Sequence, residues 1–290
     1  MALWPRWVEA LNLPESPLHL DTPLIQLAGS ADEAERMSSL AADRPQSGLR
    51  FMASEGLCEA DPPWPQTGHG AMLSNLDGRV DPLRLMTALR RELRALNVEL
   101  RPTHVINLQR LTAARGSRWH LTFADGGSDE VDHVVICLAL GSARLLQPLG
   151  HDRPMDAVLG QVLELRLNHS TRWSEWPAVL TCGGINLIPI GPDRLWLGAT
   201  LEPGQSADPS AVKALHQLNN LAPEWLMNAQ IVGQWHGLRA RPCGRPAPLL
   251  EQLEPGLLLA SGHYRNGVLL APATAEWVKQ QIDNAMITDS

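Results

Sequence analysis

The apolar residues between positions 82 and 96 recur at helical spacing. Most members of this stripe lie three or four positions apart: Leu85, Met86, Leu89, Leu93 and Leu96. The stripe follows Asp81 and Pro82, and aspartate is a favoured N-cap while proline is favoured in the first helical turn. Asn97 is a residue type that often ends a helix. The pattern predicts an amphipathic helix over residues 82–96.

Shorter apolar runs of strand length follow this helix. They cover residues 98–100, 104–108, 118–123 and 134–140, with an Asp-Gly-Gly turn at residues 125–127. The continuous run at 134–140 predicts a buried strand. A helix, a meander and a buried strand in this order indicate an α/β sheet with an antiparallel excursion.

The second half of the chain adds antiparallel strands. Apolar residues alternate with others over residues 158–167, and two further runs, 185–190 and 194–200, flank a Gly-Pro-Asp turn. A capped helix over residues 209–218 and a strand over residues 231–238 follow. The predicted fold class is therefore α/β, in the mixed α+β sense.

The last predicted unit combines a strand, a turn and a helix. The run 257–260 predicts a buried strand, Gly262 and Gly267 bracket the turn, and Pro272 is expected to open the helix. Such a turn brings free backbone N–H groups and the positive end of a helix dipole to a ligand. The alternative is an ordinary tight connection whose glycines only supply positive φ. The Tyr and Arg in this turn favour a ligand site.

Three arginines follow the predicted strand at 231–238. Arg239, Arg241 and Arg245 place three guanidinium groups close together in the sequence. The planar fork of arginine suits bidentate recognition of a carboxylate or phosphate. The alternative is a solvated surface cluster, which the spacing alone favours.

Charge and composition restrict the partners. The chain has 24 Lys plus Arg against 31 Asp plus Glu, a net charge of −7, and no Lys/Arg run. A nucleic-acid partner is therefore not expected, because neutralising phosphates needs a basic face. No apolar stretch approaches the ~20 residues that span a bilayer, so no membrane partner is expected either.

Cysteine and histidine usage gives no sign of disulfide or metal chemistry. Cys58, Cys137, Cys182 and Cys243 are far apart, which predicts core thiols in a reducing, cytoplasmic compartment. The ten His do not form a metal-ligating spacing, so no metal site is predicted.

Residues 262–272 resemble the C-terminal signature of the FAD-dependent D-amino acid oxidase superfamily, and most of all its glycine oxidase branch. Other segments agree in the same order along the chain, from about residue 2 to residue 285. They are Asp77-Gly78-Arg79-Val80-Asp81-Pro82, Val134-Val135-Ile136, Gly160-Gln161, Leu187-Ile188-Pro189, Gly198-Ala199-Thr200 and Gly237-Leu238-Arg239.

The resemblance implies FAD as cofactor and hydride transfer from the α-carbon of a small amino acid or amine to the flavin. It implies that Arg239 holds the substrate carboxylate and that the backbone at Val105 meets the adenine end of FAD. It also implies backbone contacts to the flavin pyrimidine from the C-terminal turn, at Gly262, Arg265, Asn266, Gly267 and Val268. The N-terminal end of the following helix would stabilise negative charge on the reduced flavin.

The sequence departs from the family pattern in three places. The strand, GxGxxG turn and helix that open such proteins and bind the FAD pyrophosphate are absent, so we expect an incomplete Rossmann-like domain that lacks its first βαβ unit. Asn186 stands where glycine oxidases tend to have tyrosine, and residues 138–141 replace an Ala-Gly-Ala-Trp turn. The sheet edge exposed by the absent unit predicts either a homo-oligomer or poor stability.

Two interleaved domains are predicted. The FAD-binding-like domain comprises residues 78–150 and 233–290, and the antiparallel-sheet substrate domain comprises residues 1–77 and 151–232. The function predicted from the resemblance is that of an FAD-dependent amino acid or amine oxidoreductase. The alternative is a degenerate, non-catalytic relative that keeps the fold and binds a carboxylate ligand.

Overall fold

The computed structural model describes residues 3–56, 60–112 and 117–288. The chain divides into two compact units, and each is discontinuous in sequence. Unit 1 comprises Met1–Glu92, Leu159–Glu202 and Ser206–Gly237, and unit 2 comprises Leu93–Val158, Pro203–Gln205 and Leu238–Ser290. The predicted domain boundaries lie instead at residues 78, 151 and 233. The assignment of one domain to FAD and the other to the substrate stays a prediction.

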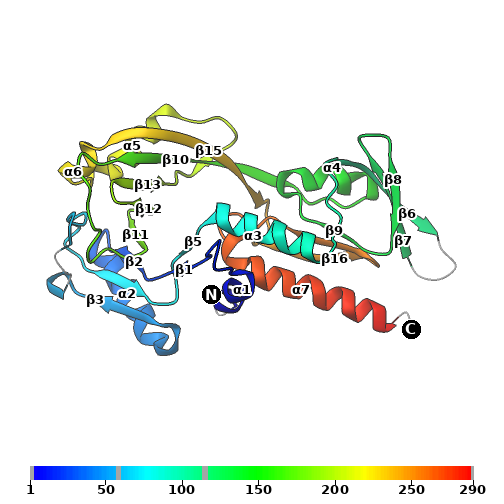
Figure 1. Cartoon of the computed structure of the whole chain (residues 1–290), viewed down its shortest axis with the longest axis horizontal. Coiled ribbons are helices and arrows are strands. Elements are labelled where there is room, and N and C mark those ends of the chain that lie inside the picture. Colours follow the sequence, from blue (N-terminus) through cyan, green and yellow to red (C-terminus); the bar gives the residue numbers. More distant parts are fainter. Residues whose placement is uncertain (1–2, 57–59, 113–116, 289–290) are drawn as a thin grey trace. The chain divides into compact units, whose positions relative to one another are not determined.

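Unit 1 is built on a large, mostly antiparallel sheet (Figure 1). Its strands run in the order β14-β10-β13-β12-β11-β2-β4-β3, with β15 also paired to β10. Their bounds are β2 Leu24–Leu27, β3 Leu49–Met52, β4 Ala71–Ser74, β10 Met155–Arg166, β11 Val179–Cys182, β12 Ile185–Gly191, β13 Arg194–Gly198, β14 Glu202–Pro203 and β15 Gln230–Pro242. The pair β2–β11 is parallel. The turn predicted between residues 190 and 194 joins β12 to β13 and is confirmed.

Alternating leucines give this sheet one buried face. Fully buried leucines stand at alternate positions in parts of β10, β12 and β13: Leu163, Leu165, Leu187, Leu195 and Leu197. They pack with Leu215 of α5 (Pro209–His216) and Leu226 of α6 (Glu224–Met227) in one core. Because side chains alternate across a strand, the residues between these leucines lie on the opposite face.

Three helices occur in the N-terminal segment, and the third of them begins as the sequence predicts. They are α1 Trp4–Leu11, α2 Ala31–Asp43 and α3 Pro82–Ala95, the last of which continues from unit 1 into unit 2. Asp81 Oδ1 accepts hydrogen bonds from the N–H groups of Leu83 and Arg84, and Asn97 follows with a φ of 55°. The predicted cap and stop are confirmed. Leu85 is buried beside α1 and the β1–β5 pair (Leu20–Asp21 and Arg79–Val80), whereas Met86 is exposed.

Unit 2 contains two three-stranded sheets. One is antiparallel, with β6 Val105–Thr112, β7 Ser117–Phe123 and β8 Ser128–Val131. The other has the order β16-β17-β9, with β16 Leu249–Glu254, β17 Leu257–Ser261 and β9 Val134–Ile136, and β17 runs parallel to β9. All of β17 is buried, as predicted for residues 257–260. Trp119 is fully buried in the core, where its Nε1 donates to the Pro255 carbonyl at 3.2 Å.

Two α-helices and five 3-10 turns complete the described residues. The α-helices are α4 Ser142–Leu146 and α7 Gly267–Thr288 (orange to red in Figure 1). The 3-10 turns are Pro45–Ser47, Ser54–Gly56, Ala139–Gly141, Gln147–Leu149 and Leu218–Asn220. No helix in this part of the chain is long and apolar enough to cross a membrane. The mixed α/β fold class is confirmed.

Three predicted elements are wrong. Residues 98–100 form no strand, because the Val98 N–H bonds back to the Leu93 carbonyl at the end of α3. The strand predicted to extend to residue 140 ends at Ile136, where the chain turns into a 3-10 helix. Helix α7 begins at Gly267 and not at Pro272, which lies inside it. Proline is tolerated there although it cannot donate to the carbonyl four residues earlier.

The cysteines have different environments. Cys182 is a buried core thiol, as predicted, and burial raises its pKa to about 11. Cys137 is exposed, so the prediction of a core thiol is wrong there, and Cys243 is half-buried. Cys58 lies outside the described residues.

Candidate functional site

The turn between β17 and α7 is held in one backbone conformation. Gly262 is buried with a φ of +64°, and a Cβ at this position would lie 2.8 Å from Pro242 Cγ. A side chain is excluded by both the conformation and the contact. The N–H of Tyr264 donates to the Ala240 carbonyl of β15 at 3.2 Å. These contacts join the turn to β15 just beyond Arg239.

The N-terminal end of α7 offers backbone donors. Asn266 N bonds to the His263 carbonyl at 3.0 Å, and Leu270 N bonds to the Asn266 carbonyl at 2.9 Å, which closes the first helical turn. The first N–H groups of an α-helix have no acceptor within the helix. Arg265, Asn266, Gly267 and Val268 are all exposed, so a ligand can reach this end of the 22-residue helix.

Arg239 lies close to this turn. Burial lowers the pKa of this half-buried guanidinium, and the positive charge of Arg265 lowers it further, against the opposite effect of Tyr264. The structure therefore brings Arg239 and the predicted turn residues together. A half-buried arginine beside an exposed one suits an anionic ligand, and the forked guanidinium suits a carboxylate.

The other two arginines of the cluster pair with carboxylates. Arg241 Nη2 lies 3.1 Å from Asp156 Oδ2, and Arg245 Nη1 lies 3.1 Å from Glu251 Oε1. Glu251 also accepts three hydrogen bonds from Arg153. The cluster is thus not a uniform solvated face, because two of its arginines form ion pairs with carboxylates elsewhere in unit 2.

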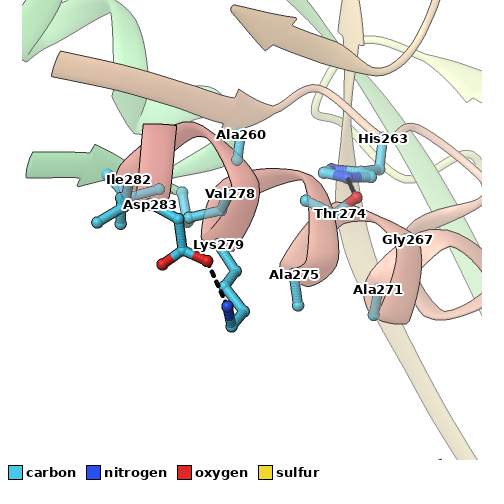
Figure 2. A pocket seen from close by; sticks show the side chains of 12 residues that line it. Ala260, His263, Gly267, Ala271, Thr274, Ala275, Val278, Lys279, Ile282 and Asp283 are labelled. Carbon is cyan, nitrogen blue, oxygen red and sulfur yellow. Dashed lines mark hydrogen bonds and ion pairs between the residues drawn. The ribbon is translucent and has the colours of Figure 1, made fainter. Parts of the chain in front are cut away.

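A cavity of about 660 Å³ runs beside α7 in unit 2 (Figure 2). Its lining is mostly small and apolar and includes Val135, Cys137, Ala260, Ala271 and Ala275. His263 closes one part of the wall, with its Nε2 2.9 Å from Thr274 Oγ1. Burial lowers the pKa of His263, which keeps the imidazole neutral near pH 7.

Val105 begins β6 and lines a second cavity of unit 2, of about 550 Å³. His104, His133, Leu138 and Arg144 also line it. Neither Arg239 nor the 262–268 turn contributes to this cavity, so the structure does not bring Val105 together with the other predicted residues. Val135 of β9 lines both this cavity and the one beside α7.

Unit 1 has a cavity of its own on the open face of its sheet, of about 750 Å³. We call it the sheet-face cavity. Its floor includes Val162, Asn186, Ile188, Trp196 and Trp235. Sequence reasoning singled out Asn186 but missed both tryptophans, because alternation within a strand does not show which face carries a cavity.

A buried polar network lies between β10, β14 and α5 in unit 1. Glu202 accepts hydrogen bonds from Gln161 Nε2 at 3.0 and 3.2 Å, from Asp208 N at 2.7 Å and from the Thr200 hydroxyl. Gln234 Nε2 donates to Gln161 Oε1 at 3.0 Å. Burial raises the pKa of Glu202, but these hydrogen bonds lower it more, so that the net shift is downward. Gln161 and Thr200 thus each supply a hydrogen-bond donor to the buried carboxylate of Glu202.

Glu202→Gln is expected to lower the free energy of unfolding at pH 7 by about 1–3 kcal/mol, since an amide nitrogen cannot accept these bonds. A carboxyl with a depressed folded-state pKa contributes stability above its unfolded pKa and loses it as the pH falls through the folded pKa. Urea unfolding from pH 7 downward should therefore show the wild-type and variant stabilities converging in acid. Glu224→Gln, at an exposed position of α6, is the control. Stabilities of the wild type and Glu202→Gln that stay parallel as the pH falls would contradict the prediction.

No group of three or more His, Cys, Asp or Glu within the described ranges could hold a metal ion. The arrangement in unit 2 instead combines backbone donors at a helix N-terminus, the half-buried Arg239 beside the exposed Arg265, and a mostly apolar cavity. Such a combination defines a class of α/β protein that binds an organic ligand carrying acceptor groups.

Comparisons with known proteins give the family. The family model described as FAD dependent oxidoreductase matches residues 1–281. The glycine oxidase of Bacillus licheniformis is 26% identical over 273 residues, which cover 90% of this chain and 69% of that protein. The glycine oxidase of Pseudomonas putida is 33% identical over 200 residues, which cover 67% of this chain but only 52% of that protein.

Structural comparison agrees with the sequence comparison. The crystal structure of glycine oxidase from Geobacillus kaustophilus matches with a TM-score of 0.82 and 25% identity, covering 98% of this chain and 77% of that one. The chain belongs to the DAO family of FAD dependent oxidoreductases. Its resemblance to the glycine oxidase branch is confirmed.

The described residues fit FAD on structural grounds. The absence of a side chain at the buried Gly262 lets the turn pack closely against Pro242, while the backbone of residues 265–268 stays exposed. Gly267 at the start of α7 also lacks a side chain that would cover the first N–H groups. Backbone donors of this kind suit the carbonyl oxygens of a flavin pyrimidine ring.

Proposed function

We propose that this chain supplies the flavin-binding and substrate-binding parts of an FAD-dependent oxidoreductase that oxidises a small amino acid or amine, as a glycine oxidase does. The observation that carries the proposal is Arg239, half-buried beside Arg265 and next to the turn before α7. A carboxylate bound there would neutralise one of two neighbouring positive charges. Membership of the family supports FAD as the cofactor.

The residues of this chain take separate roles in the proposal. Arg239 binds the substrate carboxylate and orients the α-carbon. Gly262, Arg265, Asn266, Gly267 and Val268 offer backbone contacts to the flavin pyrimidine, and Val105 lies at the adenine end. Residues 78–150 and 233–290 would form the flavin part, and residues 1–77 and 151–232 the substrate part. A homo-oligomer also stays a proposal.

FAD, when bound, would accept a hydride from the α-carbon while the amine loses a proton, and water would hydrolyse the resulting imine while oxygen or another acceptor reoxidised the cofactor. The protein contributes orientation and electrostatics. The N-terminal end of α7 carries partial positive charge, which favours negative charge on a group bound against it. By holding the carboxylate, Arg239 would fix the position of the α-carbon to which that carboxylate is attached.

The non-catalytic alternative is not supported. The relatives compared above are named as oxidases, and the family itself is described by its reaction class. The positions discussed here show no substitution that would remove the proposed carboxylate contact. Arg239 is present and half-buried.

Flavin retention and reduction test the proposal. Protein purified with added FAD should keep a flavin absorbance band after desalting, and a small amino acid such as glycine, added without oxygen, should bleach it. Protein that never retains flavin, or retained flavin that no small amino acid or amine reduces, contradicts the proposal.

FAD is also expected to protect Cys137 from alkylation. Cys137 is exposed and lines the cavity beside α7, so a flavin bound there would cover it, whereas Cys243 does not line that cavity. Iodoacetamide labelling followed by peptide mass spectrometry, with and without saturating FAD, measures both thiols in one sample. Cys137 should label more slowly with FAD while Cys243 labels at the same rate. Equal protection of both, or of neither, contradicts this placement.

A further inference from the structure

The sheet β16-β17-β9 of unit 2 ends on an open edge. Among the strands that the structure describes, β9 is the outer one and pairs only with β17, in parallel. The Val134 N–H donates to the Gly256 carbonyl at 2.8 Å, beside β17. Successive residues of a strand turn their backbone groups to opposite edges, so the N–H and C=O of Val135 point to the open edge.

The edge strand β9 carries none of the features that usually protect an edge from pairing. Natural edge strands are commonly blocked by charged side chains, a proline or a bulge. The sequence Val134-Val135-Ile136 has neither a charge nor a proline, and its register with β17 is regular. Strands of parallel sheets that are covered on both faces read as continuous apolar runs of this kind. The edge of β9 therefore suits a further strand.

A second segment of unit 2 has the pattern of a strand but pairs with no described strand. Its apolar residues alternate and are 72%, 45% and 50% exposed: Leu96, Val98 and Leu100. Arg101 ties the end of this segment to the β6–β8 sheet, because its Nη2 lies 3.1 Å from Asp129 Oδ2 and its guanidinium lies over the Phe123 ring. The alternating side chains are thus held in place while they remain exposed.

An apolar cavity of about 550 Å³ lies beside both features. Residues 103–105, which follow the strand-like segment, line it together with β9. The β6–β8 sheet contributes further apolar side chains: Leu108, Leu121 and Val131. Because side chains alternate across a strand, every second side chain of a strand added to β9 would point into this cavity.

On its other side, β9 faces helix α7. Val135 and Cys137 line the cavity of about 660 Å³ beside that helix. The helix presents four residues along this cavity, at spacings of four, three and four: Ala271, Ala275, Val278 and Ile282 (Figure 2). We call them the α7 stripe. Apolar residues at this spacing form the face with which one helix packs against another.

The three features together define one kind of occupant. Parallel strands are joined by a crossover connection that is usually a helix packed on the sheet, in a βαβ unit of about 30 residues or more. A strand beside β9 followed by a helix on the α7 stripe is the first part of such a unit, and its second strand can pair with residues 98–100. The α7 stripe begins beyond Gly267, so the first N–H groups of α7 stay available for the proposed flavin contacts.

The length of a solved relative supports an occupant of this size. The match to the Geobacillus kaustophilus glycine oxidase covers 98% of this chain but 77% of that one. Because 290 residues correspond to about three quarters of that chain, its unmatched part is long enough for a βαβ unit. A second copy of this chain fits less well, since a two-fold axis would pair β9 with β9 in antiparallel and leave residues 98–100 without a partner.

We propose that this side of unit 2 docks a βαβ segment that lies outside these 290 residues. One strand of the segment pairs in parallel with β9, its helix packs on the α7 stripe, and its other strand pairs with residues 98–100. The apolar side chains of its strands fill the cavity beside residues 103–105. This inference goes beyond the proposed function, because it names a polypeptide partner and not a substrate.

Co-expression and hydrogen exchange test the inference without added FAD. The probe is the part of the Geobacillus kaustophilus glycine oxidase that has no counterpart in this chain, carrying an affinity tag and produced together with the full 290 residues. The two polypeptides should purify together in equal amounts. Amide exchange followed by mass spectrometry should slow at least about tenfold over residues 96–100 and 134–138, relative to the chain alone, because strand pairing protects N–H groups.

Two variants of α7 form a matched pair. Ala275 and Ala273 are both exposed, but only Ala275 belongs to the α7 stripe. Ala275→Arg places a charge where the helix of the segment would pack, so the amount of chain retained on the tagged segment should fall at least about tenfold. Ala273→Arg should be retained as the wild type is. Thermal unfolding of each variant alone should match the wild type, which shows that neither change disrupts α7.

Three results would overturn the inference. The first is a chain that does not retain the segment or shows unchanged exchange in its presence. The second is slow exchange over residues 96–100 and 134–138 in the chain alone, together with a dimer in sedimentation, which would make a second copy the occupant. The third is equal retention of the two α7 variants. The proposed function fails separately, when retained flavin is not bleached by any small amino acid or amine.

Discussion

Gly262→Ala is expected to destabilise the protein by about 2–5 kcal/mol. An L-residue at a φ of +64° costs about 1–2 kcal/mol, and the contact of 2.8 Å between the new Cβ and Pro242 Cγ adds about 1–3 kcal/mol. In a chain of this size that corresponds to a decrease in Tm of roughly 3–8 °C. Thermal unfolding followed by circular dichroism measures it.

Gly244→Ala separates the two causes. Gly244 has a similar φ of +62°, but no atom lies within 4 Å of a Cβ built there. It should therefore show only the conformational cost, about 1 kcal/mol. Equal losses of stability in the two variants would mean that the contact with Pro242 contributes nothing.

Arg239→Lys should raise KM for an amino acid about 10–100-fold while changing kcat less. A lysine keeps the charge but cannot reproduce the two parallel hydrogen bonds of the guanidinium fork. Loss of binding that is equal in the ground and transition states appears in KM. Steady-state kinetics on flavin-loaded protein measures both constants.

Arg241→Lys is the matched control on the same strand. Its guanidinium pairs with Asp156 at 3.1 Å, and a lysine can keep an ion pair of this kind. KM should stay within about twofold of the wild-type value, as expected for an exposed pair. A tenfold rise in KM for Arg241→Lys, or an unchanged KM for Arg239→Lys, would remove Arg239 from the carboxylate role.

Much of the fold can be predicted because its signals are local. The Asp81 cap, the turn between β12 and β13 and the apolar run of β17 each depend on a few neighbouring residues, and all three are confirmed. Residues 98–100 have strand-like alternation but lack a partner strand, and that lack is visible only in three dimensions. Pro272 predicts a helix start because proline favours the first helical turn, but α7 begins at Gly267.

The residues of the candidate sites also differ in whether a local sequence signal reveals them. Arg239 and the 262–267 turn could be named from the sequence because each lies in a short continuous motif, and a backbone hydrogen bond from Tyr264 to Ala240 brings the two motifs together. Trp196 and Trp235 could not be named, since they are 39 residues apart and meet only through ring packing. The sequence alone does not distinguish Arg239 from Arg241, because the ion-pair partner of Arg241 is Asp156, which is distant in sequence.

Most boundaries of the two compact units fall inside regular elements. The division passes through α3 after Glu92, through β10 after Val158 and through β15 after Gly237. A protease that cuts exposed linkers finds none at these points, so limited proteolysis should not release either unit intact. For the same reason, exchanging unit 1 between relatives requires several simultaneous sequence junctions, most of them inside helices or strands. Specificity in this chain is therefore more readily altered by single substitutions than by transfer of a whole module.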